Sequence, residues 1–266
     1  MIKKTKSVII WLIKRILFRI DPAYRLASNN RVQLEVIQKS FLVNKLLFKQ
    51  CAEITAGVQF IGQELQDMYA YLYFQGKRDG FFVDIGAYDG ITISNTYALE
   101  KLGWKGICIE PIPEIYQKLT KNRSCYCVNV AIYDEDKQLE FIQTKGGRSG
   151  CVINMSKAMM ENAKAEGIVR ELAIKTITFT TLMEKYNVEY IDFMSIDVEG
   201  SELNVLASID FNRYKFGLIT IENNQGITLL KEFMFAKGYK LFLNLGVDLI
   251  FIPRNVEIGE YWWNDL

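Results

Sequence analysis

The stretch FFVDIGAYDGITISNT (81–96) decides the fold. An apolar, β-rich run, Phe81–Ile85, leads into a turn that holds two glycines, Gly86 and Gly90, and a helix is predicted over 94–103. Strand, turn and helix in this order are the opening unit of a parallel α/β sheet. Because glycine lets the backbone approach a ligand closely, we expect a ligand to bind just after this strand.

The same alternation continues through the rest of the chain. Further strands are predicted at 106–109, 126–130, 191–196 and 218–221, with helices at 113–121, 200–208 and 227–237. A last pair of runs, 239–244 and 248–253, is typical of an antiparallel hairpin at the sheet edge. The pattern predicts a mostly parallel sheet with helices on both faces, and such sheets bind ligands at the carboxyl ends of their strands.

Acidic side chains follow these strands. Asp84 and Asp89 flank the glycine turn, which disfavours a pyrophosphate and favours a ligand with a positive centre. Glu110 follows the second strand, where an acid suits the hydroxyls of a ribose, although a helix-capping carboxylate is the alternative. The two signals together favour an adenosyl ligand. Asp197 and Glu222 lie at the ends of the fourth and fifth predicted strands, which are apolar, so we expect them to have ligands, metals or hydrogen bonds.

The composition narrows the chemistry. Among the 266 residues there is no His, so neither a His-ligated metal nor an imidazole base is available, and a general base must be a carboxylate, Lys, Tyr or Cys. The five Cys are odd in number and form no C-x-x-C pair, which favours reduced, buried thiols. The net charge is only +1, so the chain as a whole is not a general binder of polyanions.

The charge is distributed unevenly along the chain. Residues 1–50 hold seven Lys and four Arg against two acids, a net +9, whereas the rest carries a net −8. The segment 3–20 is amphipathic, and its apolar run 8–13 is too short to span a bilayer. We predict a basic helical arm at 1–50 that binds an anionic membrane surface; a helix packed on its own domain or on a second subunit is the alternative.

Five segments in this order resemble the FkbM family of S-adenosylmethionine-dependent methyltransferases. The resemblance covers about residues 60–253 and rests on FFVDIGAYDGITISNT (81–96), GICIEPIPE (106–114), TFTTLMEKY (178–186), IDFMSIDVEGSE (191–202) and ITIENN (219–224). It implies an α/β, Rossmann-like class I methyltransferase fold, with a mostly parallel seven-stranded sheet and an antiparallel last strand. It also implies S-adenosylmethionine as the methyl donor. The resemblance does not cover residues 1–50, which we expect to form an N-terminal helical extension.

The resemblance also implies a cofactor site. Asp84 and Gly86 would hold the methionine part, Glu110 the ribose hydroxyls, and Asp197 would lie beside the reactive methyl. The complete set implied for the cofactor is Asp84, Gly86, Asp89, Gly90, Thr92, Asn95, Glu110, Pro111, Ile112, Asn129 and Asp197. Acidic groups are favourable around this ligand because its sulfonium is cationic.

Catalysis of methyl transfer to a hydroxyl requires removal of a proton. We predict Asp197, Glu199 and Glu222 as the catalytic residues, with Glu199 or Glu222 as the base in a metal-free reaction. Alternatively, Asp197, Glu222 and Asn223 offer oxygen ligands for Mg²⁺, which would lower the pKa of the hydroxyl.

These observations lead to a functional hypothesis. We expect an O-methyltransferase that acts on a sugar hydroxyl of a glycan or glycolipid, in the cytoplasm and peripherally on the inner face of the membrane. The alternative is a non-catalytic, adenosyl-binding or membrane-tethered scaffold in glycan assembly. Nucleic acid is not expected as a partner, because the core is acidic. The predicted domains are the arm, 1–50, and a methyltransferase domain, 51–266, with a lid-like insert near 143–175 that could also be an ordinary surface excursion.

Overall fold

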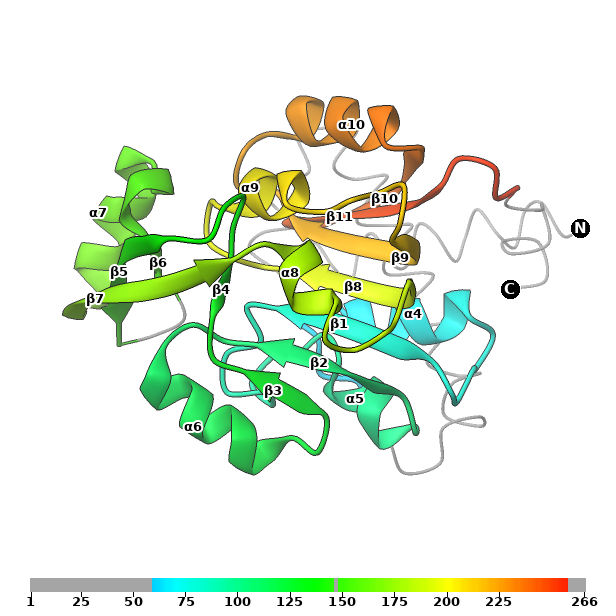
Figure 1. The fold of residues 1–266 in the computed structure, drawn as a ribbon, viewed down its shortest axis with the longest axis horizontal. Coiled ribbons are helices and arrows are strands. Elements are labelled where there is room, and N and C mark those ends of the chain that lie inside the picture. The colour runs from blue at the N-terminus through cyan, green and yellow to red at the C-terminus, as the bar shows by residue number, and fades with distance from the viewer. Residues whose placement is uncertain (1–58, 146–147, 258–266) are drawn as a thin grey trace, which may run out of the picture. The chain divides into compact units, whose positions relative to one another are not determined.

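The computed structural model describes residues 59–145 and 148–257, which belong to one compact unit that spans 57–258 (Figure 1). The predicted basic arm, 1–50, lies outside the described residues. Within the described part of the chain, no helix combines the length and the hydropathy that crossing a bilayer requires. The four described cysteines, 108, 125, 127 and 151, are free thiols, as the sequence predicts.

The centre of the fold is a seven-stranded sheet. Its strands, in spatial order, are β10 (Tyr239–Leu245), β11 (Asp248–Pro253), β9 (Lys215–Glu222), β8 (Tyr190–Ile196), β1 (Phe81–Ile85), β2 (Lys105–Ile109) and β3 (Tyr126–Val128). Only β11 runs antiparallel to its neighbours; the other pairs are parallel. The chain winds outward from β1 through β2 to β3 and then restarts at β8 on the other side of β1. The winding therefore reverses between β1 and β8, where such sheets open a ligand-binding crevice.

Apolar strands explain why this sheet is central. In β1 and β8 every residue after the first is buried, and because successive side chains point to opposite faces, both faces of the sheet are covered. The covering helices are α4 (Gln66–Tyr73), α5 (Tyr97–Lys101), α6 (Pro113–Asn122), α8 (Phe179–Met183), α9 (Glu202–Ala207) and α10 (Ile227–Ala236). The predicted fold class and its antiparallel last strand are thus confirmed.

A second, smaller sheet lies to one side of the first (Figure 1). Its order is β4 (Ala131–Ile132), β7 (Ile168–Ile177), β5 (Gln138–Thr144) and β6 (Gly150–Cys151), followed along the chain from β6 by a short 3-10 turn, Val152–Asn154, and by α7 (Lys157–Glu166). Most of the insert predicted near 143–175 therefore belongs to β6, α7 and β7. Strands β5 and β7 were not predicted, because their alternating pattern of exposed and covered residues contains several charges and lacks the apolar runs of the central strands.

Helix α5 begins later than the sequence predicts. The expected span was 94–103, whereas the helix starts at Tyr97. The hydroxyl of Ser94 accepts hydrogen bonds from the backbone N–H groups of Thr96 (3.3 Å) and Tyr97 (3.2 Å), which holds the chain in a turn ahead of the helix. Residues 86–96 therefore form a long loop at the end of β1, and this loop faces the ligand crevice.

Candidate functional site

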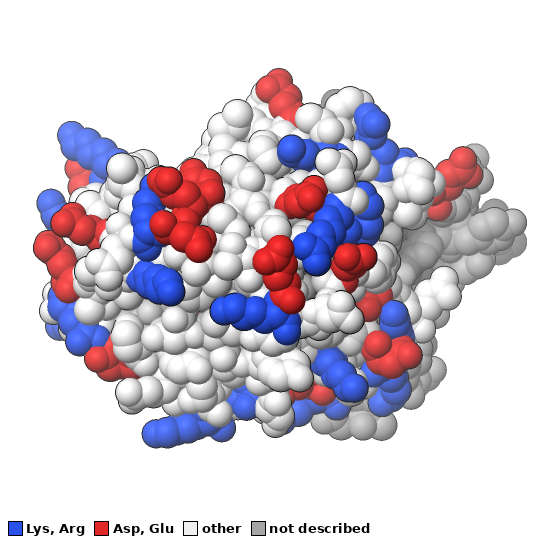
Figure 2. All heavy atoms as spheres, viewed as in Figure 1, with Lys and Arg blue, Asp and Glu red and all other residues white. Residues whose placement is uncertain are grey.

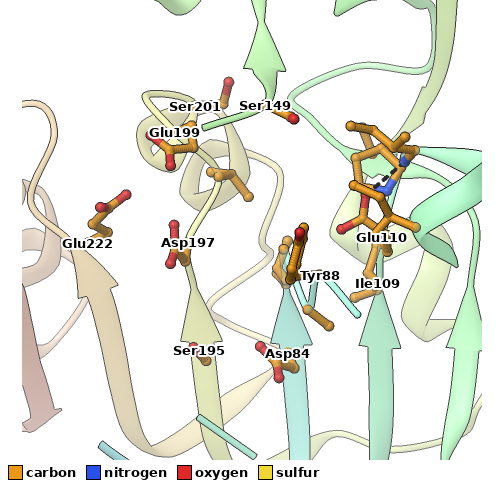
Figure 3. Close-up of a pocket in the computed structure, with 18 of the residues that line it drawn as sticks. Asp84, Tyr88, Ile109, Glu110, Ser149, Ser195, Asp197, Glu199, Ser201 and Glu222 are labelled. Carbon is orange, nitrogen blue, oxygen red and sulfur yellow. Dashed lines mark hydrogen bonds between the residues drawn. The ribbon is translucent and has the colours of Figure 1, made fainter. Parts of the chain in front are cut away.

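A cavity of about 500 Å³ opens at the carboxyl ends of β1, β2, β8 and β9 (Figure 3). Its floor is the loop after β1, and residues from β4, β5 and α7 wall it on the side of the small sheet. The volume lies in the range typical of small-molecule and cofactor sites. Of the residues predicted for the site, ten line this cavity: Asp84, Gly86, Thr92, Asn95, Glu110, Pro111, Ile112, Asp197, Glu199 and Glu222.

The turn after β1 packs directly on the loop after β8. Gly86 has a φ of +90°, and a Cβ at this position would overlap the carbonyl oxygen of Asp197, so only glycine fits. The N–H groups of Gly86 and Ala87 both donate to the carbonyl of Ile109 at 3.0 Å. The turn is therefore fixed against the strands on both of its sides before any ligand arrives.

Asp84 lies below this turn. Its Oδ2 accepts a hydrogen bond of 2.6 Å from the Thr96 hydroxyl. Burial raises the pKa of Asp84, while the Thr96 hydroxyl and the Arg123 guanidinium oppose that rise. The guanidinium in turn donates to the carbonyl of Gly90 (3.2 Å) and to the Thr96 hydroxyl (3.1 Å) and pairs with Glu100. This buried network of charged side chains therefore stabilises the loop after β1.

Two predicted cofactor residues, Asp89 and Gly90, shape the loop without lining the cavity. Asp89 accepts hydrogen bonds from the N–H groups of Ile91 (3.0 Å) and Thr92 (2.8 Å) and from the Thr92 hydroxyl (2.7 Å). Gly90 has a φ of +80°, and a Cβ there would press on side-chain carbons of Arg123. Both residues therefore stabilise the conformation of the loop after β1.

Asn95 lines the cavity and contacts the end of β8. Its Nδ2 donates to the Ser195 hydroxyl at 3.0 Å, and its Oδ1 is buried with no hydrogen-bond partner among the described residues. The side-chain amide of Asn95 therefore links the loop after β1 to β8.

The end of β2 carries Glu110, whose side chain is buried. Its carboxylate accepts from the backbone N–H of Ile112 at 2.8 Å and also from that of Tyr88. Burial outweighs these bonds and raises the pKa of Glu110 to about 8. Asn129 does not line the cavity; its Nδ2 donates to the carbonyls of Glu110 and Pro111, both at 2.9 Å. It therefore holds the Glu110 segment in place from outside the cavity.

Three carboxylates meet at the other end of the cavity. Oxygens of Asp197, Glu199 and Glu222 all lie within 4.8 Å of one another (Figure 3). Burial and the charges of Glu222 and Glu199 raise the pKa of Asp197, and burial with the charge of Glu222 raises that of Glu199 to about 8. Among the residues that line the cavity, the one basic side chain is Arg148. This acidic cluster, Asp197, Glu199 and Glu222, therefore carries little compensating charge.

Asn223, predicted as a metal ligand, follows Glu222 directly in the chain but does not line the cavity. Its N–H donates to the carbonyl of Val247 at 2.8 Å, and its Oδ1 is buried without a hydrogen-bond partner in the described part of the chain. Glu199, predicted as a catalytic residue, lies with Asp197 and Glu222 in the acidic cluster. Glu199 reaches this position because its backbone adopts a φ of +52°, which the sequence pattern did not indicate.

The described residues match a known family. A profile of the Methyltransferase FkbM domain matches residues 84–241, more than half of the chain. The chain belongs to the FkbM methyltransferase family. The matched region begins at Asp84 and includes the glycine turn, Glu110 and the acidic cluster. A comparison with curated proteins gave no match.

Solved structures with a similar fold are also methyltransferases or RNA-processing proteins. The fibrillarin pre-rRNA processing protein of Methanococcus jannaschii is 14% identical at a TM-score of 0.39, over 68% of this chain and 69% of its own. TrmK of M. capricolum, solved with S-adenosyl-homocysteine, is 11% identical at a TM-score of 0.38, over 74% and 70%. A TehB-like SAM-dependent methyltransferase from Corynebacterium glutamicum is 11% identical at a TM-score of 0.39, over 81% and 98%.

The cavity of this FkbM methyltransferase suits the cofactor of its class, S-adenosylmethionine. The glycine turn allows close approach of a ligand, and the acidic lining favours a cationic sulfonium. Apolar side chains, Ile109 and Ile112 among them, line the cavity beside Glu110. The residues present therefore fit an adenosyl ligand with a positive centre.

Several lining residues of the FkbM domain were missed by the sequence analysis of the site. They are Tyr88, Tyr133, Phe141, Glu166 and Ser201. Tyr133, Phe141 and Glu166 come from or flank the small sheet, whose strands were not predicted. Tyr88 lies inside the motif itself, and its φ of +50°, rare for an aromatic residue, was not visible in the sequence.

Proposed function

We propose that this FkbM methyltransferase is an O-methyltransferase whose acceptor is a sugar hydroxyl of a glycan or glycolipid. The observation that carries the proposal is the acidic cluster, Asp197, Glu199 and Glu222, at one end of the cavity. Hydroxyls are weak acids, so methyl transfer to them is aided by a group that accepts the proton. The carboxylates provide such a group without any His in the chain.

In the proposed orientation the cofactor spans the cavity. Glu110 accepts hydrogen bonds from the ribose hydroxyls, Pro111 and Ile112 contact the adenine, and Asp197 lies beside the methyl group. Burial holds the Glu110 side chain at the end of β2, and Asn129 fixes the backbone around it. These features support the proposal, because a hydrogen-bond acceptor that is already in position reduces the free-energy cost of binding the ribose.

The reaction is an in-line displacement. The acceptor oxygen attacks the methyl carbon, the carbon–sulfur bond breaks, and sulfur keeps the electron pair, which leaves S-adenosylhomocysteine. The acceptor proton passes to the acidic cluster. We assign the accepting role to Glu222, which ends β9 and faces Asp197 and Glu199 across the acidic cluster. The protein otherwise positions the two reactants and excludes water.

The charge of the cavity favours an uncharged acceptor. Carboxylates at Asp84, Glu110, Glu166 and the acidic cluster line it, against Arg148 as the basic lining residue of the described chain. A phosphate close to the reacting group would be repelled by this lining, which disfavours nucleic acid. A polyol such as a sugar avoids that repulsion and can donate hydrogen bonds to the carboxylates.

Binding of Mg²⁺ by the acidic cluster is the alternative to proton transfer to an unligated Glu222. Asp197, Glu199 and Glu222 would hold it, since hard carboxylate oxygens that lie within 4.8 Å of one another suit this ion. A bound divalent cation would supply Lewis acidity to the acceptor hydroxyl. It would also relieve the mutual repulsion that raises the pKa of Asp197 and Glu199.

Formation of S-adenosylhomocysteine in the presence of candidate acceptors tests the proposal. The full chain is incubated with S-adenosylmethionine and, in separate reactions, with neutral oligosaccharides, glycolipids, small amines and RNA, each with EDTA or with Mg²⁺. We expect product with a sugar acceptor and an added mass of one methyl group on oxygen. Product only with amine or RNA would overturn the acceptor class, and full activity in EDTA would overturn the metal. Cofactor binding without turnover on any acceptor would favour the non-catalytic scaffold.

A further inference from the structure

Tyr88 is a cavity residue to which the reaction as described gives no role. It lies inside the glycine turn, two residues beyond Gly86, and lines the same cavity as Glu110 and Asp197. Its backbone N–H donates to the Glu110 carboxylate, so the two residues are in direct contact. Figure 3 shows the ring standing over the end of β1, between Asp197 on one side and Glu110 on the other.

The backbone of Tyr88 is held in an unfavourable conformation. Its φ of +50° lies in the left-handed region, which aromatic residues rarely occupy. The neighbouring turn enforces this conformation, since Gly86 and Ala87 both donate to the Ile109 carbonyl and Gly90 donates back to Ala87 at 2.9 Å. Outliers of this kind gather where the geometry serves a ligand, so the position of the ring itself requires an explanation.

The environment of the ring is both enclosed and acidic. Burial, then the charges of Asp89, Glu110 and Glu166, raises the pKa of the Tyr88 phenol. The phenol therefore stays neutral, and the ring lies among carboxylates on both sides of the cavity. An electron-rich aromatic face in a negative, partly dehydrated site is the environment in which a cation is bound most strongly by a π-system.

We propose that the ring of Tyr88 binds the sulfonium of S-adenosylmethionine and so makes the site prefer this cofactor over its neutral product. The inference rests on the proposed function, in which the cofactor reaches from Glu110 to Asp197. A ligand that spans these two residues must pass the Tyr88 ring, and the atom between its ribose and its methionine chain is the positively charged sulfur. After methyl transfer the sulfur is neutral, the cation–π attraction is lost, and release of S-adenosylhomocysteine is favoured.

The test compares affinities for S-adenosylmethionine and S-adenosylhomocysteine by isothermal titration calorimetry. In Tyr88→Leu, we expect the ratio of the two affinities to shift toward S-adenosylhomocysteine by roughly three- to thirty-fold, the range of a cation–π contact from exposed to dehydrated sites. Tyr88→Phe keeps the ring and should keep the ratio. Ile112→Ala, at the proposed adenine end, should weaken both ligands alike, and Tyr126→Leu, an exposed tyrosine outside the cavity, should change neither.

A second variant separates this role from a structural one. Asn tolerates a positive φ better than Tyr, so Tyr88→Asn should raise the melting temperature while it lowers the preference for S-adenosylmethionine. An unchanged ratio in both Tyr88→Leu and Tyr88→Asn would overturn the inference, as would an equal loss in Tyr88→Phe, which would point to the hydroxyl. If the unaltered protein bound neither ligand, the proposed function itself would fail. If it bound both ligands but the ratio did not change in the variants, only the inference about Tyr88 would fail, so the two failures are distinguishable.

Discussion

The cavity has two halves, which we name after the roles proposed for them: the cofactor half, on the side of β1 and β2, and the acceptor half, on the side of β8, β9 and β11. The buried carboxylates of the two halves have different partners. On the side of β1 and β2, Asp84 and Glu100 share the guanidinium of Arg123, whose side chain is fully buried. On the side of β8, β9 and β11, Asp197 and Glu222 have no such cation, and the neighbouring acids find neutral partners: the Asn224 amide bonds both Glu202 and Glu222. An amide satisfies a hydrogen bond without neutralising the charge, whereas a guanidinium does both.

This difference distinguishes carboxylates that stabilise the fold from carboxylates that can take part in the proposed reaction. A carboxylate paired with a buried cation is a fixed part of the fold, because removing either partner leaves an uncompensated charge. Burial and then the charges of neighbouring carboxylates raise the pKa of Asp197 and Glu199, and groups of this kind can exchange protons or bind a cation. On the face drawn in Figure 2, acidic and basic side chains are interspersed, whereas among the residues that line the cavity Arg148 is the one basic side chain.

The largest effect is expected in the acceptor half. Glu222→Gln removes the proposed proton acceptor, so turnover should fall by about 10²- to 10⁴-fold. Binding of S-adenosylmethionine, measured by calorimetry, should change little. Glu232→Gln, a matched change at an exposed site on α10, serves as the control. Equal loss of cofactor binding and turnover in Glu222→Gln would show that the residue belongs to the cofactor half.

The cofactor half is expected to respond in stability. Arg123→Met leaves Asp84 and Glu100 buried without their cation and removes the bonds to Gly90 and Thr96. We expect about 3–5 kcal/mol of lost unfolding free energy in urea denaturation, the range for breaking a buried ion pair. Arg213, which pairs at the surface with Glu184 and Glu189, provides the control, and Arg213→Met should leave the urea midpoint unchanged. A small effect in Arg123→Met would show that the buried network is not essential.

A smaller effect is expected at the boundary of the two halves. Above pH 8, where the Glu110 carboxyl is ionised, Glu110→Gln keeps the shape of the side chain but removes the charge that strengthens its bonds to ribose hydroxyls. Loss of a charge-assisted hydrogen bond, worth about 1.5–3 kcal/mol, corresponds to roughly ten- to a hundred-fold weaker binding. S-adenosylmethionine and S-adenosylhomocysteine should weaken alike, because the ribose is common to both. A selective loss of one ligand would contradict the assignment of Glu110 to the ribose.

The sequence predicted the central fold well because that fold depends on local pattern. The strands around Asp84, Glu110, Asp197 and Glu222 are short apolar runs that end in an acid, and the structure brings those ends to one cavity as the parallel sheet requires. The predicted and observed bounds of β1 and β11 are identical, and those of β2, β8 and β10 agree to one residue.

What the sequence could not predict depends on backbone geometry and on distant packing. Glu199 and Tyr88 reach the cavity through positive φ values, which no residue type in the motif announces. Asn129 and Arg123 act through long-range hydrogen bonds to the Glu110 and Gly90 carbonyls. The walls from the small sheet were missed because β5 and β7 are only half covered and are rich in charge.

The smallest expected effect is a dependence of stability on pH that the acceptor half should dominate. Burial raises the pKa of Glu199 from 4.5 to about 8 and that of Asp248, on the neighbouring strand β11, from 3.8 to about 7. Glu110, at the boundary, rises to about 8 as well. In the folded state these acids keep protons that the unfolded chain has already released. Stability is therefore greatest below about pH 4, as far as these groups are concerned, falls as the pH rises toward 8, and levels off above it.

Thermal unfolding of the ligand-free protein between pH 5.5 and 8.5 tests this expectation. Raising the pH should lower the melting temperature by on the order of a few degrees, and Glu199→Gln should flatten the fall because it removes one of the protons involved. Glu232→Gln should leave the slope unchanged. If the melting temperature still falls with pH in Glu199→Gln but no longer does so in Glu110→Gln, then Glu110, at the boundary with the cofactor half, is the carboxyl responsible for the pH dependence. The contrast between a neutralised cofactor half and an uncompensated acceptor half would then have to be redrawn with Glu110 on the acceptor side.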